Sequence, residues 1–472
     1  MMRSHFWIGL VLSAVWAARA GAQAPEPISL HVHPAAAPVP ALQYQFLPDA
    51  AELMPGNAAI FYLRAYSPEW HSHRRIPGIG DKLVAWRKTS LKDLPRKELA
   101  WLATYNPLRE LDYAARHEIC DWELRERVRK EGIHLLLPEL QGYRELANLL
   151  AVRARLEMAE HRYADAVSTL QTGFSLARDV GEGPTLLHFL VGMAITHVMA
   201  EQVETLMEQP DAPNFYWALT VLPSPLARLR KPLMGEKVLV ESLLPGQHEL
   251  ETMIMTPQQV QELVERARRN MDWAETFGAS HGADRAIFAL LVAKTYPAAK
   301  SALIKKGRSQ EEVEAMPALQ VVLLYSLDQY RQLRDAMFRW ADVPYWQAAR
   351  GLQRADEELR AARATGSEGL PLASVFLPAT QKVYQAGARG DRRIAALRSI
   401  EAIRLYAAGH KGKLPAQLSD VTDVPIPIDP MTGKTFEYRV EGNKFTLLGP
   451  PPAGEAPSAN NTLEYDVTLG EK

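Results

Sequence analysis

Two histidine pairs are the first residues of this chain whose type and spacing could do chemistry. His31 and His33 are two positions apart, and so are His71 and His73. On an extended segment this spacing places both imidazoles on one side, as a zinc or copper site requires. Glu69 is near the second pair, but two arginines follow that pair directly and would repel a cation. We therefore interpret both pairs as incidental surface histidines and predict no metal site.

Other catalytic signatures are missing from the sequence or lack their setting. No Gly-x-Ser-x-Gly, phosphate-binding or dinucleotide-binding glycine motif is present. His188 and His197 are nine positions apart, which does not place them on one helical face. Asp121 and Glu123 have the types of a glycosidase pair, but on the helix that we expect there they would not face each other. We interpret Cys120 as a buried side chain of that helix. No catalytic residue is assigned and no cofactor is expected.

Composition limits the classes of function. The 472 residues include 54 Lys and Arg against 55 Asp and Glu, which argues against a nucleic-acid partner because such binding depends on excess positive charge. Cys120 is the only cysteine, so an internal disulfide and a cysteine zinc site are excluded. Acidic pairs such as Glu357 and Glu358 lie on arginine-rich helix faces, a pattern typical of solvated ion-pair surfaces.

The N-terminal residues predict export. A basic start, an apolar run over residues 6–18 and a small-x-small sequence indicate a signal peptide at residues 1–22, cleaved before Gln23. We expect a periplasmic or secreted protein with no transmembrane helix after cleavage. A retained anchor is the alternative, because Arg19 interrupts the cleavage region. Prolines among alanines over residues 23–41 predict an extended spacer.

Helical periodicity dominates residues 42–365, so we expect a mainly α protein built as a helical array or bundle. Helix starts are marked by Thr256 before Pro257 and by the capping-box spacing after Ser309. A linker is expected at residues 366–390. Long helices are expected at residues 113–130, 140–160, 163–180, 184–207, 257–277, 310–340 and 344–364.

Residues 150–178 resemble a single tetratricopeptide repeat. The residues that carry this resemblance are Ala154, Tyr163, Ala166, Leu170 and Gly173. It implies an αα-hairpin in which small residues stand where two helices approach closely. The following residues do not repeat the pattern, so a repeat-like array and an ordinary helical bundle both stay open.

Residues 391–452 predict a small C-terminal α+β module that starts with an amphipathic helix. Asp391 is an N-cap type, and Gly409 can adopt the left-handed conformation that closes a last turn. One face of the helix is apolar. We expect its other face to be solvated, and the basic residues of that face are Arg392, Arg393, Arg398 and Arg404.

The rest of the module predicts a hairpin. Residues 429–433, Asp-Pro-Met-Thr-Gly, have turn chemistry, and β-prone runs follow at residues 435–440 and 444–448. Preceded by the helix and a Gly-Lys-Leu-Pro loop, this order resembles the globular head of type II secretion pseudopilins. The resemblance implies a helix packed on a small sheet. Residues 453–472 are expected to form a C-terminal tail.

Pseudopilin heads also carry a calcium loop, which is not clearly present here. Asp420, Asp423 and Asp429 could supply hard oxygen ligands, but further acidic residues that would complete the coordination are missing. The alternative is that Asp429 accepts hydrogen bonds from backbone amides of its own turn.

Taken whole, the chain resembles an uncharacterised family of bacterial secreted proteins. The segments that carry this resemblance are residues 42–44, 55–58, 120–122, 181–185, 395–406 and 429–433. We expect an exported helical scaffold or protein-interaction protein of the cell envelope, with a protein or peptide partner. The alternatives are a hydrolase of envelope or extracellular polymers, whose site gathers dispersed His, Asp and Glu, and a lectin-like carrier.

Overall fold

The computed structural model describes residues 26–67, 76–132, 135–242, 246–270, 284–367, 369–370, 372–373, 377 and 380–470. The expected signal peptide and the pair His71 and His73 lie outside the described residues, as does part of the expected linker. The chain divides into two compact units. Unit 1 contains Met1–Trp122, Leu137–Leu229 and Val383–Lys472, and unit 2 contains Glu123–Leu136 and Arg230–Lys382.

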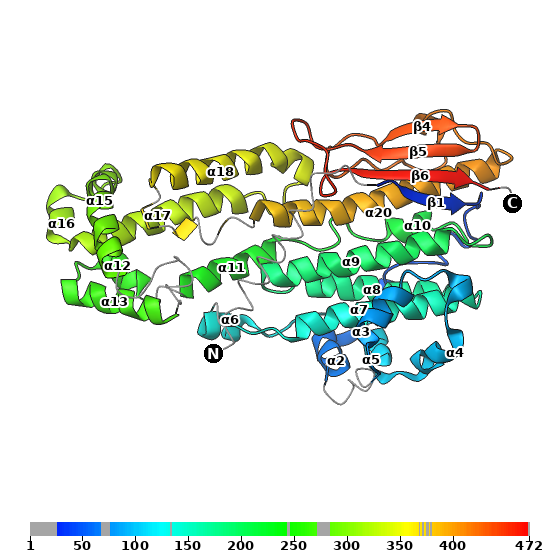
Figure 1. Cartoon of the computed structure of the whole chain (residues 1–472), viewed down its shortest axis with the longest axis horizontal. Coiled ribbons are helices and arrows are strands. Elements are labelled where there is room, and N and C mark those ends of the chain that lie inside the picture. The colour runs from blue at the N-terminus through cyan, green and yellow to red at the C-terminus, as the bar shows by residue number, and fades with distance from the viewer. Residues whose placement is uncertain are drawn as a thin grey trace. The chain divides into compact units, whose positions relative to one another are not determined.

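Unit 1 combines helices with a four-stranded sheet (Figure 1). Its helices are α2 (Ala58–Ala65), α3 (Ile79–Trp86), α4 (Arg96–Leu99), α5 (Asn106–Ala114), α7 (Glu139–Ala159), α8 (Tyr163–Gly181), α9 (Leu186–Met207), α10 (Tyr216–Thr220) and most of α20 (Thr380–Gly409). Its strands are β1 (Ile28–Val32), β2 (Met54–Asn57), β3 (His117–Ile119), β4 (Glu437–Glu441), β5 (Lys444–Gly449) and β6 (Leu463–Leu469).

Helices α7 and α8 form the αα-hairpin that the sequence predicts, and both pack against α9. Gly173 lies at the contact between α8 and α9. A Cβ atom at this position would lie 2.0 Å from the sulfur of Met199, so a larger residue would force the Met199 side chain to move. Helix α9 is the one helix of the described residues that is long and apolar enough to cross a membrane, and 67% of its most apolar window is buried inside the protein.

The larger sheet has the strand order β1-β6-β5-β4. Strands β4 and β5 form the expected hairpin, and β6 continues it antiparallel to β5. Strand β1 lies parallel to β6, with Ile28 opposite Tyr465. The structure therefore corrects the sequence analysis at both ends, because the expected spacer at residues 23–41 and the expected tail at residues 453–472 each contribute a strand. A pairing between opposite ends of a chain leaves no local pattern in the sequence.

Helix α20 lies along this sheet (Figure 1) and begins earlier than expected. It starts at Thr380, so Asp391 is an interior residue and not an N-cap. The Asp391 carboxylate instead accepts a hydrogen bond from the backbone N–H of Leu226 at 3.1 Å. Because most of α20 and the whole sheet belong to unit 1, the module at residues 391–452 is not a separate domain.

Unit 2 is helical in its described residues. Its helices are α6 (Arg125–Glu131), α11 (Arg230–Ser242), α12 (Gln247–Thr252), α13 (Pro257–Asn270), α15 (Asp284–Lys305), α16 (Gln310–Ala315), α17 (Ala318–Phe338) and α18 (Tyr345–Thr365). The expected cap at Ser309 is confirmed, since its hydroxyl accepts from the N–H of Glu312 at 3.1 Å. The single helix expected at residues 310–340 is wrong, because Pro317 separates α16 from α17.

The helix expected at residues 113–130 is also wrong. Helix α5 ends at Ala114, β3 follows, and α6 begins only at Arg125. Strand β3 lies parallel to β2, with Met54 opposite His117. Cys120, Asp121 and Glu123 therefore lie outside helices. Taken together, the expectation of a mainly α protein with a small C-terminal α+β module is confirmed.

Candidate functional site

Two of the segments that are distinctive in the sequence, residues 55–58 and 120–122, meet in unit 1, where Asn57 joins them. The Asn57 Oδ1 atom accepts from the N–H of Ala59 at 3.1 Å and from the N–H of Asp121 at 2.9 Å. Its Nδ2 donates to the carbonyl oxygen of Asp121 at 2.8 Å. One side chain therefore caps α2 and fixes the segment that follows β3.

An aromatic cluster supports α2 from the protein interior. The ring of Trp122 lies 5.8 Å from that of Tyr62 and 5.3 Å from that of Tyr143. Asp179 of α8 accepts from the Tyr62 hydroxyl at 2.9 Å and, through its backbone oxygen, from Trp122 Nε1 at 3.0 Å. Burial raises the pKa of the Tyr62 hydroxyl well above its usual value, so the phenol stays protonated and donates. His188, which is buried, completes the cluster 6.2 Å from Trp122.

The same elements also carry large apolar side chains that are exposed to solvent. We define the α2–β3 surface as Ile60, Leu63, Tyr113 and Ile119, which are between 46% and 59% exposed. Ile60 and Leu63 lie three positions apart on α2, and α2 contacts both α5, which carries Tyr113, and β3, which carries Ile119. Half-buried Phe61 links these elements, since its ring lies 6.3 Å from Tyr113 and 4.4 Å from His117. Large apolar side chains that are positioned rigidly and left in water are typical of a docking surface.

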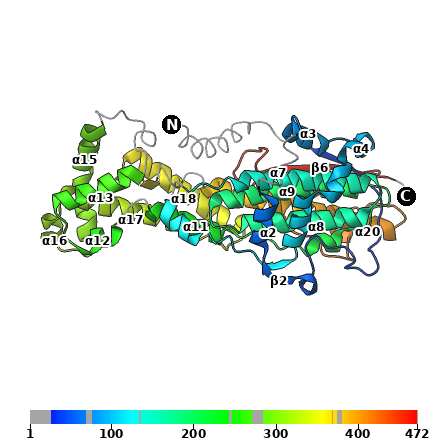
Figure 2. The same ribbon diagram turned by 90° about the horizontal axis from the view of Figure 1, so that it is seen from below.

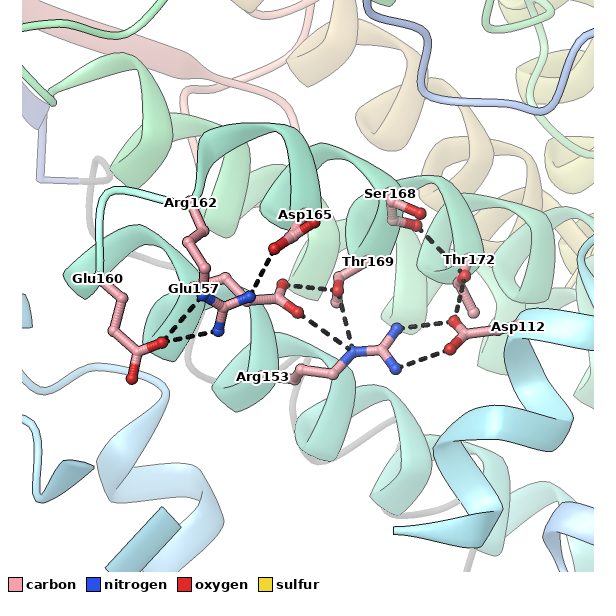
Figure 3. Close-up of polar contacts among 9 residues, drawn as sticks. All are labelled: Asp112, Arg153, Glu157, Glu160, Arg162, Asp165, Ser168, Thr169 and Thr172. Carbon is pink, nitrogen blue, oxygen red and sulfur yellow. Dashed lines mark hydrogen bonds and ion pairs between the residues drawn. The ribbon is translucent and has the colours of Figure 1, made fainter. Parts of the chain in front are cut away.

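A polar network joins the α7–α8 hairpin to α5 (Figure 3). Arg153 donates to both carboxylate oxygens of Asp112, at 2.7 and 2.9 Å, and its Nε donates to Thr169 Oγ1 at 2.9 Å. The Thr169 hydroxyl in turn donates to Glu157 at 2.7 Å. Thr172 donates to Asp112 at 2.7 Å. Side chains from α5, α7 and α8 therefore take part in one connected network.

Glu157 is the residue of this network that can exchange a proton near neutral pH. Burial raises the pKa of its carboxyl group to about 7, although Arg153 and Thr169 act in the opposite direction. A carboxyl group with such a pKa is a candidate general acid or base. However, Glu157 Oε2 is held by Thr169, and Oε1 lies 3.9 Å from Arg153 Nε. These contacts indicate a structural role.

The basic face of α20 is largely buried, so the prediction of a solvated face is wrong. Arg392, Arg393 and Arg404 are 1%, 7% and 0% exposed. Arg392 donates to both carboxylate oxygens of Asp429, and its Nε lies 2.8 Å from Oδ1. Arg404 pairs with buried Glu401 at 2.6 Å. A guanidinium removed from water requires such partners, because an unpaired buried charge costs several kcal/mol.

Arg393 connects three elements of unit 1. It donates to both carboxylate oxygens of Glu204 on α9, each at 2.7 Å. The hydroxyl of Tyr465 on β6 donates to the same carboxylate at 2.6 Å. Glu204 therefore joins α9, α20 and the sheet. An acid in a long and largely apolar helix, which also carries Glu201, was the sequence signal that could have revealed this contact, because a buried acid needs a partner.

Of the three aspartates considered as calcium ligands, Asp429 and Asp420 bind groups of the protein itself, and Asp423 is exposed. Asp429 is fully buried and accepts from Arg392 and from the N–H of Met431 at 2.9 Å. Asp420 accepts from the N–H of Gln417 at 3.0 Å at the start of the 3-10 helix Leu418–Asp420. Among the described residues, no group of three or more His, Cys, Asp or Glu side chains is arranged to hold a metal ion.

The histidines and acids singled out in the sequence occupy different environments. His31 and His33 lie at β1, with ring centroids 5.2 Å apart. His197 is 61% exposed and lies away from the buried aromatic cluster, so it does not form a site with His188. Glu357 and Glu358 are exposed on α18, as expected.

Comparison with known proteins identifies no relative. No family model, curated protein or solved structure matches this chain.

Proposed function

We propose that this protein is an exported helical scaffold that binds another protein of the cell envelope through the α2–β3 surface. The observation that carries this proposal is the exposure of four large apolar side chains on three contacting elements. Removing such a surface from water is the main favourable contribution to protein association. The hydrogen bonds of Asn57 and the aromatic cluster keep the surface in place, which reduces the entropy lost on binding.

The charge beside this surface indicates what the partner offers. Arg64 follows Leu63 on α2, its side chain is 58% exposed, and its guanidinium lies over the ring of Phe61 at 5.2 Å from the centroid. Its contact with Glu110 is long, at 4.0 Å. A partner segment with apolar side chains flanked by a carboxylate would therefore bury the apolar surface and pair with Arg64.

The buried carboxylates favour a scaffold over the alternative of a polymer hydrolase. Asp179, Glu204 and Asp429 are each held by tyrosine or arginine donors that link separate elements. A catalytic acid must instead reach substrate. These carboxylates join elements of the fold.

Site-specific photo-crosslinking tests the proposed surface. The crosslinking residue p-benzoylphenylalanine is placed at position 60 in one protein and at position 84 in a control, because Val84 is 45% exposed on α3. Figure 2 shows α3 and β2 at opposite sides of unit 1, so the control lies away from the α2–β3 surface. In intact cells we expect one crosslinked protein from position 60, lost when Ile119→Asp is added, and none from position 84. Equal crosslinking from both positions would contradict the proposal.

Export is tested independently of the partner. We expect the mature protein in the periplasmic or extracellular fraction to begin at Gln23. A chain that begins at Met1 in the cytoplasmic fraction would show that the scaffold acts elsewhere.

A further inference from the structure

A loop of apolar residues projects into water after β1. We define the apolar loop as residues 38–42, Pro-Val-Pro-Ala-Leu, which belong to a stretch at residues 34–48 without a charged side chain. Val39 is 92% exposed and Leu42 is 55% exposed, and the two residues between them are exposed as well. Exposed apolar residues ordinarily occur singly, so a run of them at the tip of a loop indicates a binding role.

Contacts on both sides hold the apolar loop at the C-terminal end of α20. Before the loop, the N–H of Ala35 donates to the carbonyl oxygen of Arg404 at 3.2 Å. After the loop, the ring centroid of Tyr44 lies 6.0 Å from that of Phe215. The N–H of Phe215 in turn donates to the Glu401 carboxylate of α20 at 3.0 Å. Figure 1 and Figure 2 both show the chain after β1 and the end of α20 at the same end of unit 1.

The chain that follows α20 offers positive charge at this end of the helix. Lys411 and Lys413 come directly after α20, and both are exposed. Two exposed acids, Asp211 and Glu441, also lie at this end, and Glu441 stands opposite Lys444 in the β4–β5 pair. The exposed lysines therefore outnumber these acids, which favours an anionic partner.

We propose that the apolar loop inserts into the surface of an anionic lipid bilayer, while Lys411 and Lys413 contact the lipid headgroups. Val39 is almost fully exposed, whereas the side chains of the α2–β3 surface are about half packed against their own elements. A partly packed patch suits the flat surface of a protein partner. A projecting apolar side chain with lysines nearby suits a bilayer, whose acyl chains surround an inserted side chain. This inference does not rest on the proposed scaffold function.

Vesicle flotation of the full-length mature protein tests the loop. We expect the protein to float with vesicles of phosphatidylglycerol and phosphatidylethanolamine, and much less with phosphatidylcholine alone. Val39→Asp/Leu42→Asp should weaken binding by about tenfold or more per side chain, the size of their transfer from water. Lys411→Gln/Lys413→Gln should weaken it by about fivefold per lysine at low salt. Val84→Asp is the matched control and should bind as the wild type does, because Val84 is exposed on α3.

A fluorescent probe separates insertion from a loss of folding. In a Cys120→Ser background, the environment-sensitive dye nitrobenzoxadiazole is attached to Val39→Cys in one protein and to Val84→Cys in a control. We expect anionic vesicles to shift the emission to shorter wavelength at position 39 only. Val39→Leu keeps an apolar side chain and should float as the wild type does.

Three results would overturn the proposal: wild-type protein that does not float, equal flotation of Val39→Asp/Leu42→Asp, or unchanged emission at position 39. Crosslinking of p-benzoylphenylalanine at position 39 to an envelope protein, without vesicle binding, would assign the loop to a protein partner instead.

Discussion

Helices α18 and α20 are both rich in arginine, yet their arginines lie in opposite environments. On α18 the basic side chains are all exposed, and they are Arg350, Arg354, Arg360 and Arg363. On α20 the side chains of Arg392, Arg393 and Arg404 are buried. The sequence predicts a solvated face on both helices, and this prediction is correct only for α18.

The difference lies in where the acidic partners come from. Arg360 of α18 pairs with Asp356 one turn earlier on the same helix, at 2.6 Å, and its side chain remains 77% exposed. Arg392 and Arg393 of α20 pair with Asp429 and Glu204, which belong to other elements. A solvated arginine needs no partner, whereas a buried arginine requires a carboxylate. For Arg392 and Arg393 the tertiary fold brings that carboxylate from another element, and for Arg404 it is Glu401 of the same helix.

Removing Arg392 should have the largest effect. In Arg392→Met the Asp429 carboxylate stays buried without its cation, and we expect a loss of about 3–5 kcal/mol in the free energy of unfolding. Arg354→Met on α18 is the matched control, with an expected change within about 0.5 kcal/mol because its side chain is exposed. Urea unfolding followed by circular dichroism measures both variants.

A second variant separates the contribution of the ion pair from the cost of leaving one buried charge without a partner. Replacing both partners, in Arg392→Met/Asp429→Leu, removes the uncompensated charge, so part of the lost stability should return. If the double variant is less stable than Arg392→Met alone, the remaining hydrogen bonds of Asp429, such as the one from Met431, contribute more than the ion pair.

In the burial of its charged groups, the α7–α8 network lies between the exposed arginines of α18 and the buried arginines of α20. The pH dependence of stability tests this network. The pKa of Glu157 rises from 4.5 to about 7 on folding because of burial. Between these pH values the folded state holds a proton that the unfolded state has released. The contribution of Glu157 to the free energy of unfolding is therefore present below pH 4.5 and is lost as the pH rises through about 7. The loss amounts to about 3 kcal/mol.

Glu157→Gln should therefore flatten the decline in stability between pH 5 and pH 8, measured by urea unfolding at each pH. Part of the decline should remain, because burial also raises the pKa of Asp391 to about 7. Asp391→Asn in the same background should remove a further part of the decline, and Glu401 and Glu208, whose pKa values burial also raises, contribute to what is left. An unchanged slope in Glu157→Gln would mean that the carboxylate is ionised in the folded protein and belongs with the paired groups of α20.

Whether a contact could be predicted from the sequence depends on how far apart its residues lie along the chain. The α7–α8 hairpin, the cap at Ser309 and the β4–β5 hairpin depend on neighbouring residues, and all are present. The pairing of β1 with β6 and the contact of Arg393 with Glu204 join distant segments, so neither was predicted. For the candidate surface, the sequence identified residues 55–58 and 120–122 as distinctive, but not that Asn57 and Asp121 bond to each other.

The smallest effect should come from the pair on α18. Asp356→Asn removes the partner of Arg360, and because that arginine is mostly in water we expect a loss of less than about 0.5 kcal/mol, which disappears in 1 M salt. Urea unfolding at low and high salt measures it. The loss in Arg392→Met should persist at high salt, because salt ions do not reach a buried pair. The side chain of Asp356 is only 15% exposed. A salt-independent loss of stability in Asp356→Asn would therefore indicate that Asp356 stabilises the helix by packing. The two helices would then differ only in the degree to which their ion pairs are buried.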